Sequence, residues 1–420
     1  MPSASPIAGL RALLLCALLL PGLYSQAQKP TTSQVLHTAQ GLVETGVLDG
    51  AAYRIDIPGG WNGGLVMYYH GYAQTVGTFH IQEKIAGHPA PLLERHYAIA
   101  QSSYSLPGWA LPQAYPETES LRKYFVHKYG PPKETYVVGS SMGGALVMVT
   151  LELNPRPYLG GLDLCGAVGP TIESFERRFS LRAAFDYYFP NVAPPILQVP
   201  PDYLANEAER EKIAAALRRN PAGAEAMRNL MGLHSDAGVA SDIAYFTYVI
   251  GDMTRRAGGN PFDNRNLLYT GSNPADSKSD FALNDGVRRY AAQPKARQYL
   301  VRHYTPSGRL QKPMLAVHTL YDPIVQPGSL AQYDHLVQAA GFGENLVQQY
   351  VKHEGHCAIS PDEILHAFDE LVDWTHGGSR PEPGPLRGAE KPEKQDKAAP
   401  ADKPAATLAR FERPALHPRP

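Results

Sequence analysis

A glycine-rich turn at residues 139–144, Gly-Ser-Ser-Met-Gly-Gly, separates two apolar segments of different character. The β-branched and aromatic residues 135–138 before it favour a strand, whereas residues 145–153 after it favour a helix. A serine between two glycines at such a junction is typical of a nucleophile elbow, a sharp strained turn that exposes the hydroxyl. We therefore expect a strand–turn–helix unit here, with Ser141 as the candidate nucleophile.

The segments around this turn alternate between strand and helix patterns. Residues 65–69 form an unbroken apolar run, as expected for a strand buried on both faces of a mainly parallel sheet. Residues 117–129 instead repeat large apolar side chains every four positions, as an α-helix does. Further segments of the two kinds are residues 97–100, 162–168, 314–318, 330–339, 346–351 and 361–374. The alternation predicts an α/β fold with helices on both faces of the sheet.

The alternation stops between residues 171 and 309. This stretch is rich in helix-forming residues and contains no convincing buried strand, so we expect a helical cap inserted into the α/β core. The core is then made of residues 28–170 and 310–376. Residues 377–420 are rich in proline and charged residues and poor in large apolar ones, so we expect a disordered tail.

The first 27 residues have the pattern of a secretory signal peptide. An arginine precedes the apolar residues 12–20, and small residues follow at the expected cleavage site, which we place after Ala27. The apolar run is too short for a stable membrane anchor. We therefore expect a secreted or periplasmic protein.

The charges of the chain are balanced, with 39 basic and 40 acidic residues and a net charge of −1. No overall field favours nucleic acid or an anionic membrane. We expect a small molecule or a neutral polymer as the binding partner and no nucleic acid; the sequence carries no signal for the oligomeric state.

A serine hydroxyl needs an imidazole to take its proton and a carboxylate to orient that imidazole. Asp322 follows the predicted strand at residues 314–318, and His356 follows the one at residues 346–351. Parallel strands deliver such side chains to the carboxyl edge of a sheet. Asp322 and His356 are therefore the candidate acid and base.

Each assignment has an alternative. Asp163 is a second possible acid, but it lies within a predicted strand instead of after one. His353 lies three residues before His356, and we interpret it as a surface or supporting residue. His318 ends a buried strand, where a packed histidine is the simpler interpretation.

The chain order Ser141, Asp322, His356 resembles that of the α/β-hydrolase family, and the likeness extends over residues 48–376. In that family the acid follows the seventh strand and the histidine lies in a loop after the last one. The glycine before His356 resembles the glycine–histidine loop of the family. The resemblance implies an α/β-hydrolase fold and an acyl-transfer reaction with Ser141 as nucleophile.

An oxyanion hole needs two backbone N–H donors. The residue after the nucleophile, Met142, is the first candidate. The second is Tyr72, because His70-Gly71-Tyr72 resembles the histidine–glycine motif of the family, although many lipases and esterases carry three glycines there. Hydrolysis of carboxylic esters is the predicted reaction. The alternative is a serine peptidase of aminopeptidase or prolyl-oligopeptidase type, for which acidic residues of the cap could recognise an amine: Glu173, Glu176 and Asp186.

Two cysteines remain after removal of the signal peptide, Cys165 and Cys357. An oxidising compartment allows them to pair, but the sequence does not show whether their Cα atoms approach each other. The tannase and feruloyl esterase group carries cysteines directly before its serine and its histidine, where this chain has Ser140 and Gly355. That linking disulfide is therefore impossible here, and a Cys165–Cys357 bond is a different way to brace the histidine loop.

Metal and cofactor sites have little support. His353, His356 and Cys357 could offer zinc ligands, but no second ligand pair has a suitable spacing. The glycine-bearing turns are not followed by the lysine–serine or lysine–threonine pair of a phosphate-binding loop. We predict neither a metal nor a cofactor.

Overall fold

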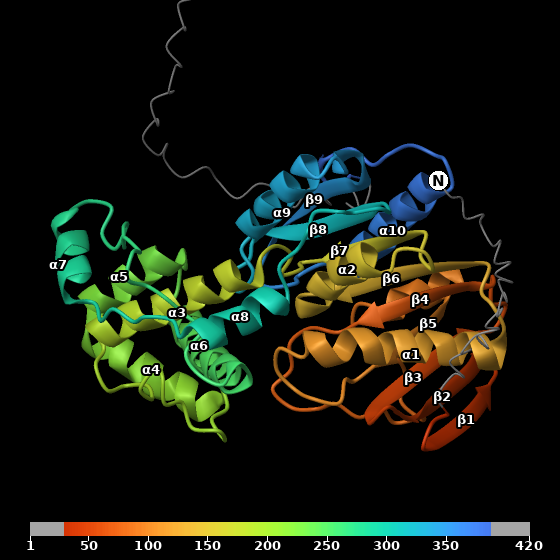
Figure 1. Cartoon of the computed structure of the whole chain (residues 1–420), viewed down its shortest axis with the longest axis horizontal. Coiled ribbons are helices and arrows are strands. Elements are labelled where there is room, and N and C mark those ends of the chain that lie inside the picture. Colours follow the sequence, from red (N-terminus) through yellow and green to blue (C-terminus); the bar gives the residue numbers. More distant parts are fainter. Residues whose placement is uncertain (1–28, 388–420) are drawn as a thin grey trace, which may run out of the picture. The chain divides into compact units, whose positions relative to one another are not determined.

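The computed structural model describes residues 29–387, so the predicted signal peptide lies outside the described residues. These residues build a ten-stranded sheet in the order β1-β2-β3-β5-β4-β6-β7-β8-β9-β10 (Figure 1). The strands are β1 (Thr32–Thr38), β2 (Gly41–Leu48), β3 (Ala51–Pro58), β4 (Gly64–Tyr69), β5 (Ala98–Ser102), β6 (Glu134–Ser140), β7 (Gly160–Leu164), β8 (Met314–Tyr321), β9 (Leu346–Glu354) and β10 (Gly384–Pro385).

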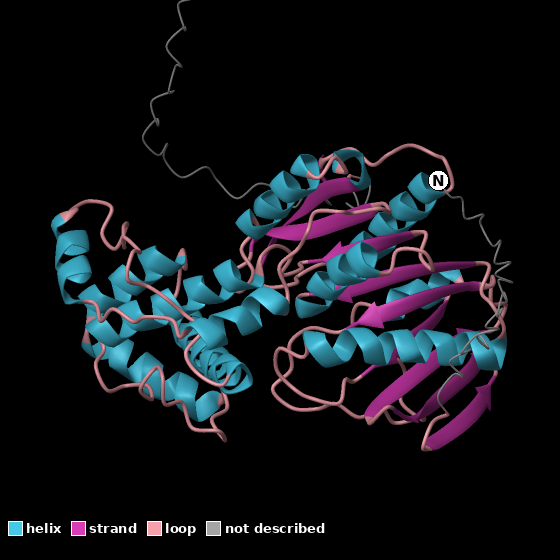
Figure 2. Cartoon of the chain, in the orientation of Figure 1, coloured by secondary structure: helices cyan, strands magenta, loops and turns pink. Residues whose placement is uncertain are grey.

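The sheet is parallel from β5 to β10 and antiparallel from β1 to β5. Strand β4 is buried along its whole length, which confirms the prediction from its unbroken apolar run. Figure 2 shows helices on both faces of the sheet, as the alternating sequence pattern predicts. The carboxyl ends of β4, β6, β7, β8 and β9 therefore all reach the same edge.

Helices α1 (Leu111–Tyr129) and α2 (Met142–Leu153) contact β4 and one another, and α10 (Pro361–Thr375) contacts β7 and β8. Six helices, α3 to α8, lie between β7 and β8 in the chain, and we call residues 171–309 the cap. The helices are η1 (Ala90–Arg95), α1 (Leu111–Tyr129), α2 (Met142–Leu153), α3 (Thr171–Tyr188), α4 (Glu207–Arg219), α5 (Pro221–Met231), α6 (Asp236–Ala257), α7 (Lys278–Gly286), α8 (Pro294–Arg302), α9 (Gly328–Ala339), η2 (Gly343–Asn345) and α10 (Pro361–Thr375). Within residues 29–387, no helix has the length and apolar character needed to cross a bilayer.

The beginning of the predicted disordered tail is ordered, which corrects the expectation for residues 377–387. Strand β10 pairs with β9 in parallel, and the Leu386 N–H donates to the Tyr350 carbonyl at 2.9 Å. The physical reason is that β9 would otherwise present an unpaired edge, and Leu386 adds buried apolar surface. A strand of two residues has no periodic pattern that the sequence could reveal. The rest of the tail lies outside the described residues.

Candidate active site

The turn after β6 places Ser141 in a strained backbone conformation, with φ of 59° and ψ of −119°, at the N-terminus of α2. Its flanking glycines are required by close packing. A Cβ on Gly139 would lie 2.2 Å from the Gly143 carbonyl oxygen, and one on Gly143 would lie 2.0 Å from the Tyr69 carbonyl oxygen. Larger residues would therefore push the turn away from β4. The geometry is that of a nucleophile elbow.

Ser141, His356 and Asp322 form a continuous hydrogen-bonded chain. The Ser141 hydroxyl lies 2.8 Å from His356 Nε2, and His356 Nδ1 lies 2.7 Å from Asp322 Oδ2. Because the carboxylate can only accept, Nδ1–H donates to it and Nε2 is left to accept the serine proton. The three side chains come from positions after β6, β8 and β9, as the sequence pattern indicated.

Asp322 is buried and held by its own loop. Its Oδ1 accepts from the N–H groups of Ile324 and Val325, each at 2.9 Å. Burial alone would raise the pKa of Asp322, but the hydrogen bond and charge of His356 and the Val325 amide outweigh it and hold the pKa below its usual value. Asp322 is therefore an anion at neutral pH and can stabilise a protonated His356.

The alternative residues lie in other surroundings. Asp163 is buried against Gly144, where a Cβ would come within 1.9 Å of its Oδ1, and this burial raises its pKa well above the usual value. His353 Nε2 lies 3.0 Å from a Glu363 carboxylate oxygen. His318 is buried, and its Nδ1 lies 3.0 Å from the Thr319 carbonyl oxygen. Of the candidates, the structure brings only Asp322 and His356 to Ser141.

The candidate oxyanion donors, Met142 and Tyr72, belong to two segments beside Ser141, the first turn of α2 and the loop after β4. As the first residue of α2, Met142 has an N–H group without an acceptor inside the helix. Gly71 packs directly on Ser141, because a Cβ there would lie 3.1 Å from Ser141 Cβ. Met142, Tyr72 and Ser141 line the same cavity. The arrangement leaves both residues as candidates for the oxyanion hole.

This cavity is small and largely apolar. Its volume of about 10 Å³ is enough for about one water molecule. Its aromatic walls are Tyr72 and Trp109 from the core and Phe175 and Tyr245 from the cap. One cationic side chain, Arg178 of α3, also lines it.

The acidic cap residues considered for amine recognition do not line this cavity. Glu176 pairs with Arg297 of α8, and Asp186 pairs with Arg182 one turn before it. Glu173 lies in the first turn of α3. The carboxylates that an aminopeptidase would use are therefore elsewhere in the cap.

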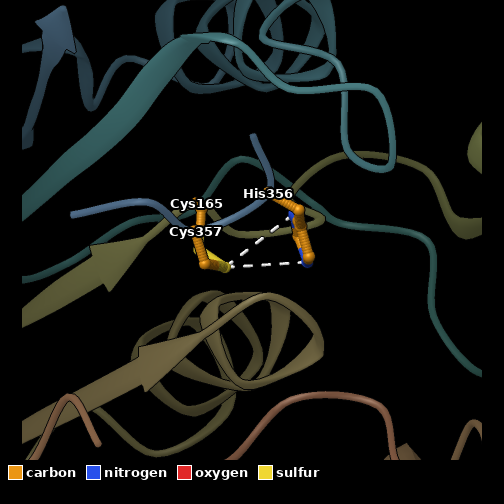
Figure 3. Close-up of side chains that lie close together, drawn as sticks. All are labelled: Cys165, His356 and Cys357. Atoms are coloured by element: carbon orange, nitrogen blue, oxygen red, sulfur yellow. Dashed lines mark hydrogen bonds between the residues drawn. A yellow bond between two sulfur atoms is a disulfide. The ribbon is translucent and has the colours of Figure 1, made fainter. Parts of the chain in front are cut away.

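Cys165 and Cys357 are joined in a disulfide, which answers the question that the sequence left open (Figure 3). Cys165 follows β7, and Cys357 directly follows His356, so the bond ties the histidine loop to the end of a central strand. The Cys357 sulfur lies 3.6 Å from His356 Nε2. These three residues are the one potential metal-ligand cluster among residues 29–387, but the bonded sulfurs are not thiolates.

Sequence reasoning missed His88 and Asp252. His88 Nδ1 lies 2.6 Å from the hydroxyl of Ser140, the neighbour of Ser141, and burial lowers the pKa of His88. Asp252 of α6 accepts from the Tyr72 hydroxyl and the Trp109 N–H, both at 2.8 Å, and thus ties the cap to the loops beside Ser141. Neither residue belongs to a motif or a regular spacing, so no local signal pointed to them.

No protein-family model matches the sequence. No curated protein matches it significantly either. Among solved structures, feruloyl esterase B from Aspergillus oryzae is similar with a TM-score of 0.44 and 12% identity, over 85% of this chain and 88% of that one. Candida antarctica lipase A is similar with a TM-score of 0.46 and 12% identity, over 86% of this chain and 84% of that one. An acylaminoacyl peptidase from Pyrococcus horikoshii is similar with a TM-score of 0.39 and 11% identity, over 84% of this chain and 42% of that one.

The fold follows from the chain's own topology. A mainly parallel sheet carries helices on both faces. The turn with Ser141 follows β6, and Asp322 and His356 follow β8 and β9. The chain therefore has the α/β-hydrolase fold.

Proposed function

We propose that this protein is a serine hydrolase that cleaves carboxylic esters through an acyl-enzyme. The observation that carries the proposal is the hydrogen-bonded chain from Ser141 through His356 to Asp322, with both distances under 3 Å. His356 Nε2 takes the serine proton as Ser141 Oγ attacks the ester carbonyl. Asp322 holds the tautomer that leaves Nε2 free and stabilises the imidazolium that forms.

The tetrahedral intermediate collapses when His356 gives its proton to the departing alcohol. A water molecule, deprotonated by His356, then attacks the acyl-enzyme, and His356 returns that proton to Ser141 Oγ as the acid is released. Backbone N–H groups of Met142 and Tyr72 stabilise the oxyanion in both halves of the reaction. Loss of such a donor typically removes about 3 kcal/mol of transition-state stabilisation.

Ester cleavage is favoured over aminopeptidase activity by the cavity beside Ser141. Aromatic and aliphatic groups suit an ester, whereas a protonated amine needs a carboxylate. The acidic residues Glu176 and Asp186 are already paired with arginines, and the cavity instead contains the cation Arg178.

We also infer that the protein works outside the cytoplasm, secreted or in a periplasm. The signal-like residues 1–27 motivate this inference, and the Cys165–Cys357 disulfide is compatible with an oxidising compartment. Detection of a mature N-terminus at Gln28 in the exported fraction is the expected result. A full-length chain retained in the cytoplasm would contradict it.

Labelling with a fluorophosphonate probe tests the nucleophile, because the probe reacts with activated serines. Ser141→Ala should abolish labelling, whereas the matched control Ser140→Ala removes the neighbouring hydroxyl and should retain it. Labelling of Ser141→Ala at the parent rate would refute the proposal. A panel of acyl esters and aminoacyl amides then separates the reactions, and faster cleavage of amides would move the protein to the peptidase class.

A further inference from the structure

Arg178 is an unusual residue for the wall of a largely apolar cavity. It lies in the middle of α3, is only 6% exposed and lines the same small cavity as Ser141. Its Nη1 donates to the carbonyl and hydroxyl oxygens of Ser174, and its Nη2 donates to the Ile324 carbonyl at 2.8 Å. Its Nε has no hydrogen-bond partner. The guanidinium thus keeps unused donor capacity on the Nε side, the edge that can bind a carboxylate bidentately together with Nη2.

The charge of Arg178 also has no direct ionic partner. Among residues 29–387, no carboxylate lies within ion-pair distance of it, whereas Arg182 one turn later pairs with Asp186. The guanidinium carbon lies 5.4 Å from the centroid of the Phe175 ring, which offsets part of the cost of burying the cation. A direct ionic partner is still missing, and the carboxylate of a substrate is a group that would supply it.

Two acidic residues act on Arg178 from a longer distance, Asp242 and Asp322. Asp322 is engaged by His356. Burial raises the pKa of Asp242 to about 7, so at neutral pH its carboxyl group is only partly ionised. Asp322 is an anion, but its two oxygens already accept from His356 and from the Ile324 and Val325 amides, and neither acidic residue pairs directly with Arg178.

The other residues that line the cavity restrict the shape of the molecule that would bring a carboxylate to Arg178. Tyr72, Trp109, Phe175 and Tyr245 line the same cavity with aromatic surface, which suits an apolar or planar spacer. Because the cavity holds only about one water molecule, these walls must separate for a substrate to enter.

Taking the proposed ester hydrolysis as given, we infer that Arg178 binds a free carboxylate of the substrate. The preferred substrates are then acidic esters, in which a carboxylate and the scissile ester are joined by an apolar or aromatic spacer. The carboxylate is carried either by the acyl group, as in a half-ester of a dicarboxylic acid, or by the alcohol. The chemistry of recognition is the same in both cases.

Two matched pairs of esters test this inference and distinguish the two carriers. Mono-4-nitrophenyl glutarate against 4-nitrophenyl pentanoate places the charge on the acyl group. 4-(Butyryloxy)benzoate against 4-methylphenyl butyrate places it on the alcohol. The quantity measured is the ratio of kcat/KM for the acidic ester to that for its neutral partner, since damage to the fold affects both members of a pair and leaves the ratio unchanged.

The parent protein should prefer the acidic ester in at least one pair. Arg178→Gln should lower that ratio about tenfold or more, mainly through a higher KM, because a charge-assisted contact is lost. Arg177→Gln is the matched control: it removes the same charge one position away, outside the cavity, and should keep the parent ratio. Arg178→Lys should give an intermediate ratio, and it serves as the test variant if Arg178→Gln does not fold.

An unchanged ratio in Arg178→Gln, or a parent that prefers the neutral ester in both pairs, would overturn the inference while leaving the hydrolase intact. The proposed hydrolase fails separately, if Ser141→Ala still cleaves the esters at the parent rate. Calorimetric titration of glutarate and 4-hydroxybenzoate into Ser141→Ala gives a readout without turnover. Binding to Ser141→Ala that is lost in the double variant Ser141→Ala/Arg178→Gln supports the inference. If neither acid binds to Ser141→Ala at millimolar concentration, the inference is overturned.

Discussion

Removal of the Cys165–Cys357 disulfide should weaken both the fold and the proposed reaction. The bond links residues 192 positions apart, and its loop encloses the whole cap. In the chain-entropy account, closing a loop of that length lowers the entropy of the unfolded chain by an amount worth about 5 kcal/mol at 25 °C. Native disulfides commonly deliver between about 2 and 5 kcal/mol, so we expect Cys165→Ala/Cys357→Ala to lose free energy of unfolding within that range.

Urea unfolding of the parent and the double variant, followed by circular dichroism, measures this loss. The parent under reducing conditions is the second comparison and should behave like the variant. Because Cys357 directly follows His356, turnover of an ester should also fall, by as much as about 100-fold if the imidazole moves by 1 Å. If the free energy of unfolding of the double variant lies within about 1 kcal/mol of the parent value, the loop-closure argument is refuted. An unchanged kcat would show that the disulfide does not position His356.

Three further substitutions test the electrostatics of the site. Asp322→Asn should lower kcat by about 10⁴-fold, because the amide no longer holds the His356 tautomer, and parent-like ester turnover would contradict this. Burial raises the pKa of Asp242 to about 7 in the folded protein, from an ordinary value of 3.8. Between these two pH values the folded protein holds a proton that the unfolded chain has lost. The free energy of unfolding of the parent therefore falls as pH rises through this range. The advantage of Asp242→Asn over the parent in urea unfolding should therefore grow from pH 5 to pH 8, and a pH-independent difference would reject the assignment. Asp252→Ala leaves three donors without their acceptor: the Tyr72 hydroxyl, the Trp109 N–H and Arg256 Nε. It should lower the free energy of unfolding by about 3 kcal/mol in the same urea experiment. A loss below about 1 kcal/mol would show that the hydrogen bonds of Asp252 are dispensable for stability.

The parts of the site that the sequence predicts are those set by local patterns. The turn at residues 139–144 needs glycines because its backbone approaches β4, and that need is written in the sequence itself. Asp322 and His356 could be chosen because each directly follows a segment with a strand pattern. The position of a residue after a parallel strand already determines which edge of the sheet it reaches.

The residues that the sequence did not reveal are those whose partners are remote in the chain. Arg178 reads as one more polar residue of an amphipathic helix, and its importance appears only when Ile324 and the cavity lie beside it. Asp252 is 180 positions from Tyr72. The pairing of Cys165 with Cys357 depends on a Cα separation of 5.2 Å that no local pattern encodes.

Backbone strain at the carboxyl edge of the sheet offers a last test of how the site is held. Ser141, Cys165 and Cys357 all have positive φ, at 59°, 53° and 57°, although none is glycine. A Cβ in this region costs on the order of 1 kcal/mol per residue, and it is retained here because the strands and the disulfide fix the chain on both sides. The alanine variant described above keeps this cost, because alanine also carries a Cβ.

Glycine at the two cysteine positions removes that cost. Cys165→Gly/Cys357→Gly should therefore have a higher free energy of unfolding than the double alanine variant, by about 1 kcal/mol or more. Inside helices and strands the order is normally the reverse, because glycine is there less stabilising than alanine. Urea unfolding of the two variants gives the comparison directly. If the alanine variant is the more stable one, the strain is not present at these positions in solution. The left-handed turns would then be a consequence of the disulfide instead of a property of the strand ends that it joins.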